Sequence, residues 1–110
     1  MHCDSMEIVK LKFHGFDWDN GNLSKLKKHR IEVEMVESCF FRDVLLYQDE
    51  IHSKGEDRFI AIGINLSNRE LFIAFTFRNY RNKKLIRVIS ARFMHLKEKS
   101  KYEKLKEKIK

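Results

Sequence analysis

Three apolar runs separated by short polar connections set the fold class of this chain. The runs cover residues 58–64, 70–78 and 85–92 and are rich in Ile, Val and Phe. Their connections, residues 65–69 and 79–84, are too short for a helical crossover and therefore favour antiparallel pairing of consecutive strands. The sequence thus predicts an antiparallel β-meander in the second half of the chain.

The segments outside the meander predict two further strands and three helices. Alternating apolar and charged residues indicate strands, while an apolar repeat at helical spacing and polar capping residues indicate helices. These elements cover residues 8–13 (strand), about 23–29 (helix, preceded by turn and capping residues 20–22), 32–41 (helix), 44–47 (strand) and about 95–110 (a Lys-rich helix). We therefore expect one α+β domain over residues 1–110. It would consist of an antiparallel sheet of about four to five strands, with two N-terminal helices and a C-terminal helix on one face.

Alternation within the last two runs separates a core face from a polar face. The bulky apolar residues at odd positions are predicted to face the core, and they are Leu71, Ile73, Phe75 and Phe77. Thr76 and Arg78 fall on the opposite face, and Arg87 is out of phase with its apolar neighbours. Arg87 fits either an exposed arginine on a half-covered sheet or part of a concave basic surface, and the other strand arginines favour the basic surface.

The formal net charge of +7 is confined to the last third of the chain. Residues 1–77 hold ten Lys+Arg and thirteen Asp+Glu, a net of −3, whereas residues 78–110 hold thirteen and three, a net of +10. Such asymmetry suggests a polyanionic partner. For the lysines of the closing helix, residues 97–110, a solvated surface is the favoured explanation. That explanation does not extend to Arg78, Arg81 and Arg87, or to Arg92, because they lie outside the helix.

The strand arginines suggest phosphate chemistry. Arg78, Arg87 and Arg92 lie at the ends or in the middle of adjacent predicted strands. A guanidinium group offers paired donors that fit phosphate oxygens and keeps its charge at any relevant pH. Several of them on one sheet face would hold backbone phosphates, and would stabilise the charge that develops on a phosphate during its reaction.

Three other positions have both a structural and a functional interpretation. His29 ends the first predicted helix, where it could cap the helix or act as a general acid or base. Glu56 and Arg58, in Gly55-Glu56-Asp57-Arg58, could form an ion pair or belong to a site. Trp18 could anchor the core ahead of a helix or stack on a base.

The sequence contains no motif for a metal, a nucleotide cofactor or a covalent nucleophile. The five His and two Cys lack the spacing of a zinc site, and no Gly-rich phosphate loop or nucleophile elbow is present. We therefore expect no cofactor. No apolar run approaches the length of a membrane span, and Cys3 and Cys39 show no disulfide framework, which favours a reducing cytoplasm.

Several separated motifs, in one order, resemble the BrnT family of toxins. The motifs are Phe16-Asp17-Trp18-Asp19-Asn20-Gly21-Asn22 followed by Lys25 and Lys28-His29, Gly55-Glu56-Asp57-Arg58 with Ile62-Gly63, Phe75-Thr76-Phe77-Arg78, Ile86-Arg87-Val88-Ile89-Ser90-Ala91-Arg92, and then Glu98 and Tyr102. The resemblance runs from Phe13 to Tyr102. The chain departs from the family pattern at Arg30, where Gly usually follows Lys-His, and in residues 65–69, which lack a Gly often found in that turn.

The resemblance implies a bacterial, cytoplasmic toxin of a type II toxin–antitoxin pair with a RelE-like fold. Such a toxin would be a metal-independent endoribonuclease that cleaves RNA and thereby inhibits translation and growth. Its partner would be a BrnA-like antitoxin, a ribbon-helix-helix protein, in a heterotetramer that contacts DNA only through the antitoxin. The alternative is a basic module that binds RNA or a protein partner without catalysis.

The resemblance also assigns roles to individual residues. Arg78, Arg87 and Arg92 would act at the scissile phosphate, and His29 and Glu56 are candidates for proton transfer. The residues expected to bind RNA are Arg58, Thr76, Lys25, Lys28 and Arg81.

Overall fold

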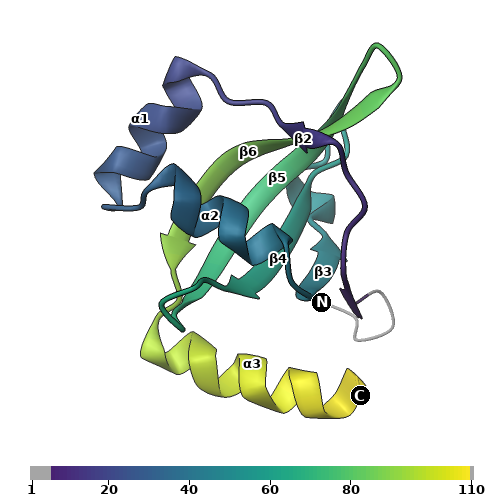
Figure 1. Ribbon diagram of the computed structural model, residues 1–110. Helices are drawn as coiled ribbons and strands as arrows, with labels where there is room; N and C mark the ends of the chain where they lie inside the picture. The colour runs from purple at the N-terminus through teal and green to yellow at the C-terminus, as the bar shows by residue number, and fades with distance from the viewer. Residues whose placement is uncertain (1–5, 110) are drawn as a thin grey trace.

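A six-stranded mixed sheet with helices on both faces forms the protein, and the computed structural model describes residues 6–109 (Figure 1). The strands are β1 (Glu7–Val9), β2 (Gly15–Phe16), β3 (Val44–Gln48), β4 (Phe59–Ile64), β5 (Glu70–Tyr80) and β6 (Lys83–Phe93). The helices are α1 (Asn20–Lys28), α2 (Val33–Phe40) and α3 (Leu96–Ile109), with a short 3₁₀ helix η2 (Glu50–His52). The sheet order is β1-β3-β4-β5-β6-β2, and every neighbouring pair is antiparallel except β2 and β6, which are parallel.

The predicted meander is confirmed as β4, β5 and β6, and its last hairpin is longer than expected. Tyr80 pairs with Lys83, so the connection has only two residues, Arg81 and Asn82. Both have positive φ, 49° and 64°, as a type I′ turn requires. The apolar pattern stops near Phe77, while the main-chain pairing continues into an exposed polar arm. The side-chain pattern therefore predicted both strands to be shorter than they are.

The predicted strand over residues 8–13 is confirmed only at Ile8 and Val9, which belong to β1, because residues 10–13 cross the sheet instead of joining it. β1 pairs with β3 near one edge, and β2 pairs with β6 at the opposite edge. Residues 10–13 connect the two edges, and Leu11 and Phe13 pack on the core. Partly buried and exposed side chains therefore alternate along residues 10–13 as they would in a strand, although these residues pair with no other strand within residues 6–109. The two short edge strands make the sheet six-stranded and mixed, where an antiparallel sheet of four to five strands was expected.

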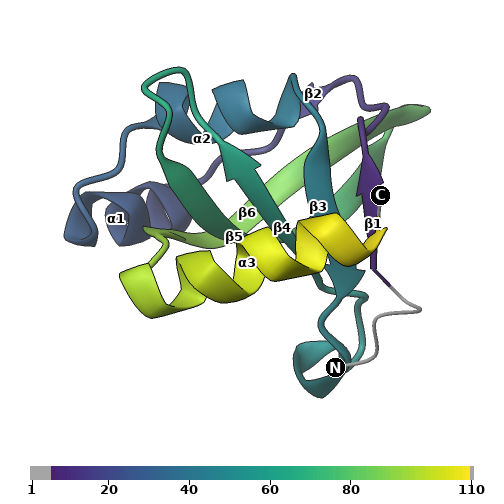
Figure 2. The ribbon, with the colours of Figure 1, turned by 90° about the horizontal axis from the view of Figure 1, so that it is seen from below.

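The helices do not share one face, as the sequence suggested. α1 and α2 cover the main core, whereas α3 lies across the other face of the sheet (Figure 2). Tyr102 of α3 packs in a second cluster with Ile60 and Ile62 of β4, against the partly buried Phe72. The even-numbered β5 residues near α3, Phe72 and Ala74, are therefore apolar because they pack in this second cluster. The Lys-rich composition of α3 hides its narrow apolar stripe from a sequence pattern.

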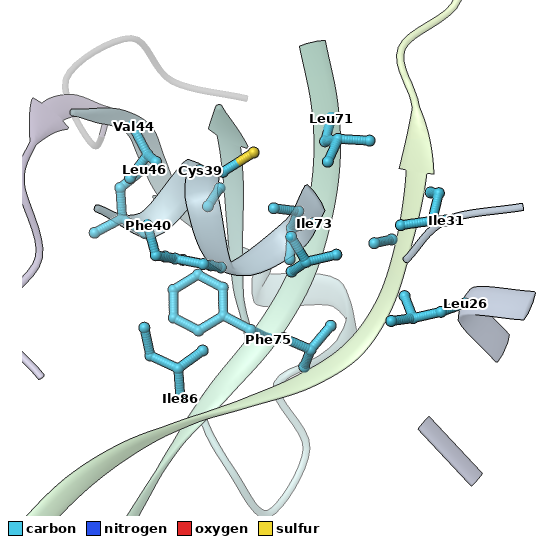
Figure 3. Packing of buried hydrophobic residues seen from close by; sticks show 14 residues of the cluster. Leu26, Ile31, Cys39, Phe40, Val44, Leu46, Leu71, Ile73, Phe75 and Ile86 are labelled. Carbon is cyan, nitrogen blue, oxygen red and sulfur yellow. The ribbon is translucent and has the colours of Figure 1, made fainter. Parts of the chain in front are cut away.

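The main core is organised around the ring of Phe75 (Figure 3). Its centroid lies 5.2 Å from that of Phe40 on α2 and 5.3 Å from that of Phe77 on β5. α2 packs so closely on β4 that a Cβ at Gly63 would lie 2.8 Å from the Cβ of Cys39, so only glycine fits there. Burial raises the pKa of the Cys39 thiol to about 12. Cys3 lies outside the described residues.

An ion pair fastens the first turn of α3 to the sheet. Arg92 of β6 donates from Nη1 and Nη2 to the two oxygens of Glu98, at 2.6 and 2.7 Å. The backbone N–H of His95 donates to the same carboxylate at 3.0 Å. The hydrogen bonds from Arg92 are the main reason that the pKa of Glu98 falls from 4.5 to about 2.

This lowered pKa predicts a loss of stability in acid. Ionised Glu98 stabilises the folded chain above about pH 4.5, and its contribution is lost as the pH falls toward 2. Because both side chains are 33% exposed, we discount the pair to about 1 kcal/mol. Glu98→Gln should lower the urea-unfolding free energy by that amount at pH 7, and the difference should shrink toward zero by pH 2. The control, Glu103→Gln, removes a more exposed carboxylate and should change little. An equal loss for Glu98→Gln at both pH values would contradict this assignment.

Candidate functional site

The half of the sheet that α3 leaves uncovered carries three arginines. Thr76 and Arg87 are register partners on β5 and β6, and Arg78 lies two residues beyond Thr76 on the same face. Arg58 reaches this face from the start of β4 by alternation with Phe59. Two residues of β5, Phe72 and Ala74, belong to the hydrophobic cluster beneath α3. Within residues 6–109, no β5 residue beyond Ala74 belongs to that cluster. We call the open area, formed by Arg58, Arg78 and Arg87, the arginine surface.

A β-bulge in β6 decides which way Arg87 points. Ala74 pairs with Ser90 while the next residue, Phe75, pairs with Val88, so Ile89 is the extra residue. Arg87 and Arg92 are five positions apart, and in a regular strand this odd spacing would place them on opposite faces. Because the bulge adds one residue to β6, Arg87 and Arg92 lie on the same face of the sheet, and this is also the face of Thr76. The convergence expected from the sequence therefore depends on a backbone irregularity that no residue pattern indicated.

Two carboxylates hold the guanidinium of Arg87. Its Nη2 donates to Asp19 in a short contact, and its Nη1 lies 3.4 Å from Oδ2 of Asp17. Asp19 is also the N-cap of α1, where it accepts the backbone N–H of Asn22 at 2.7 Å. The capping hydrogen bond first and Arg87 second lower the pKa of Asp19, and the hydrogen bond to Asp19 raises the pKa of Arg87. The start of α1 thereby fixes the orientation of Arg87.

Sequence reasoning did not assign a role to Asp17 or Asp19. Both belong to the Phe16–Asp19 motif that carried the family resemblance, and an Asp directly before a helix signals an N-cap. The missing information was that β2 pairs in parallel with β6, which brings Asp17 level with Arg87.

Glu56 pairs with Arg78 across the surface and not with Arg58. The Nη2 of Arg78 lies 3.7 Å from Oε2 of Glu56, and each side chain is about half exposed. Thr76 is only 3% exposed, and its hydroxyl donates to the backbone carbonyl of Asp57 at 2.6 Å. Thr76 therefore ties the loop that carries Glu56 to β5.

The structure brings Arg78, Arg87, Glu56, Thr76 and Arg58 to one area, but not the other predicted residues. Arg92 lies on the same face, where its guanidinium is engaged by Glu98 and sits 4.7 Å from the ring centroid of Phe72. The remaining positions are exposed and lie elsewhere: His29 ends α1, Lys25 and Lys28 lie in its last turn, and Arg81 is at the tip of the β5–β6 hairpin.

His29 is at the opposite end of α1 from the arginine surface. Asp19 begins the helix beside Arg87, and nine helical residues span about 13 Å. The backbone N–H of His29 donates to the carbonyl of Leu26 at 3.1 Å, and the ring is exposed. The helix-terminus interpretation of His29 fits this position.

Trp18 is a structural anchor. Its indole N–H donates to Oε2 of Glu37 on α2 at 3.0 Å, and its ring stacks near Phe16, with centroids 6.4 Å apart. Trp18 thus connects the β2–α1 segment to α2, as its position ahead of a helix suggested.

The arginine surface combines anion-binding groups with carboxylates. Arg78 and Arg87 present charged N–H donors that fit phosphate oxygens, and Glu56 beside Arg78 offers a proton acceptor. Within residues 6–109, no three His, Cys, Asp or Glu side chains gather as metal ligands would, and no helix has the length and apolar character of a membrane span.

Comparison with known proteins finds one family. A family model described as the ribonuclease toxin BrnT of type II toxin–antitoxin systems matches residues 18–98 of this chain. The match extends from the start of the Trp18–α1 segment to Glu98 and includes Arg58, Arg78 and Arg87. No curated protein matches the chain.

Proposed function

Because this chain belongs to the BrnT family of ribonuclease toxins from type II toxin–antitoxin systems, we propose that it cleaves RNA at the arginine surface. The observation that carries this proposal is the pair of oriented arginines, Arg78 and Arg87, on an uncovered sheet face with Glu56 beside them. The finer features of the proposal are a RelE-like fold, metal-independent cleavage and inhibition of translation in the bacterial cytoplasm.

The proposed reaction is an attack by a ribose 2′-OH on the adjacent phosphorus. The new P–O2′ bond forms as the P–O5′ bond breaks, which leaves a 2′,3′-cyclic phosphate and a 5′-hydroxyl. Arg78 and Arg87 would stabilise the charge on the non-bridging oxygens, and the carboxylate of Glu56 would accept the proton of the 2′-OH. Water would give a proton to the leaving 5′-oxygen. In this proposal Arg92 holds α3 in place, and Arg58 binds the RNA backbone.

The antitoxin completes the proposed function. A type II toxin pairs with a protein antitoxin. For this chain we propose a BrnA-like, ribbon-helix-helix antitoxin in a heterotetramer, with DNA bound only by the antitoxin.

RNA cleavage in EDTA tests the proposal. The purified chain, free of antitoxin, should cut an end-labelled RNA and leave 2′,3′-cyclic phosphate ends. A matched RNA with 2′-deoxyribose at the cut position should be resistant, because it lacks the attacking hydroxyl. Salt-dependent RNA binding with no cleavage product would contradict catalysis and support the non-catalytic module.

A further inference from the structure

An aromatic groove lies on the α2 side of the sheet, away from the arginine surface. Its volume is about 440 Å³, and it is bounded by residues 10–16 on one side and by the C-terminal end of α2 on the other. Phe13 and Phe16, which line it, pack against the main core beneath α1 and α2. The groove ends at Phe16, one residue before Asp17.

Aromatic rings line the groove, and one of them is largely exposed. Phe41, just after α2, is 61% exposed. Its ring centroid lies 5.8 Å from that of Phe13 and 6.2 Å from that of Phe16, and the buried ring of Phe40 lies 5.9 Å from Phe16. A rim of aromatic rings around a concave area is the kind of surface that anchors a partner side chain.

The wall of the groove is an extended segment with free backbone groups. Residues 10–13 belong to no strand and make no backbone hydrogen bond to any other residue in the described range 6–109. Leu11 and Phe13 face the core, while Lys10 and Lys12 are exposed. Extended backbone with unpaired N–H and C=O groups is a template for a strand from another chain.

The charges around the groove favour an acidic partner. Lys10, Lys12 and His14 line it. Its single acidic lining residue, Glu37, accepts a hydrogen bond from the indole of Trp18. The exposed rim is thus basic, and it complements a segment that carries carboxylates.

We propose that the antitoxin binds this groove through an extended acidic segment. The segment would pair its backbone with residues 10–13 and place an apolar side chain among Phe13, Phe16 and Phe41. The identity of the partner rests on the proposed function, but the docking does not require RNA cleavage. A segment that continues past Phe16 reaches Asp17, which contacts Arg87, so the same segment would bring its acidic residues to the arginine surface.

Two variants and their matched controls test the docking. The probe is the purified antitoxin encoded by the gene next to that of this chain. Phe41→Ala should weaken its binding by about 30-fold, the size typical of an interface hot spot, and Lys12→Glu by about tenfold. Leu66→Ala and Lys104→Glu remove an exposed apolar side chain and a surface charge elsewhere, and both should bind like the parent chain. RNA cleavage by the free toxin should be unchanged in all four.

Amide hydrogen exchange tests the backbone pairing directly. Residues 10–13 should exchange rapidly in the free chain and become protected when the antitoxin is added. Unchanged affinity of both groove variants, or no protection of residues 10–13 in the complex, would overturn the proposal. Absence of RNA cleavage by the parent chain would refute the proposed ribonuclease activity. It would not affect the test of antitoxin docking, because that test measures binding and amide protection only.

Discussion

Arg87→Ala is expected to lower the rate of RNA cleavage by about 100- to 1000-fold while the chain stays folded. Asp17 and Asp19 orient the guanidinium of Arg87, and the N–H groups that these carboxylates do not use can donate to the reacting phosphate. Arg87→Lys should lose nearly as much activity, because an ammonium group lacks the planar fork that bridges two acceptors. Removal of Arg87 leaves no buried charge behind, because the side chains of Asp17 and Asp19 are 37% and 43% exposed.

Single-turnover cleavage of an end-labelled RNA measures this effect, with urea unfolding as the check on folding. Asp19→Asn keeps a good N-cap on α1 but removes the carboxylate that orients Arg87, and it should slow cleavage by about tenfold with little change in RNA affinity. His29→Ala should cleave normally, since His29 lies at the far end of α1. Full activity of Arg87→Ala would remove Arg87 from the reaction. A large loss in His29→Ala would move proton transfer to the other end of the helix.

The meander and its core face were predictable from the sequence because they depend on local alternation. Leu71, Ile73 and Phe75 are fully buried on one face of β5, as their spacing indicated, and α2 lies where its apolar repeat placed it. α1 begins earlier than expected, because Asp19 caps it and residues 20–22 form its first turn. In these elements, each residue's environment follows from its position within a single strand or helix.

The features that position the site depend on contacts between distant segments. The bulge at Ile89 turns Arg87 to the open face, and it is visible only in the pairing of β5 with β6. Asp17 meets Arg87 across 70 positions of sequence because β2 joins the sheet edge in parallel. The residues alternate over 8–13, but only Ile8 and Val9 pair with a neighbouring strand, and residues 10–13 cross the core. A single sequence shows which residue types are present, but it does not show how the strands pair and therefore which distant residues meet.

Phe75→Ala is expected to lower the free energy of unfolding by about 3–5 kcal/mol, the usual cost of removing a fully buried ring. Phe75 is 0% exposed, and its ring lies within 6 Å, between centroids, of those of Phe40, Phe59 and Phe77. These neighbours come from α2, β4 and β5, so the cavity would not close without moving two layers of the fold. Since domains of this size are stable by about 5–15 kcal/mol, the loss brings the chain close to unfolding.

Thermal and urea unfolding measure the effect, and Phe75→Leu is the matched variant because it keeps most of the apolar volume. The melting temperature should fall by about 15–30 °C for Phe75→Ala and by much less for Phe75→Leu. Thr76, the next residue, ties the Glu56 loop to β5 from the opposite face of the strand. Phe75→Ala should therefore lose RNA cleavage at temperatures well below those that inactivate the parent chain. A melting temperature within a few degrees of the parent would show that the ring cluster does not hold β5 beneath the arginine surface.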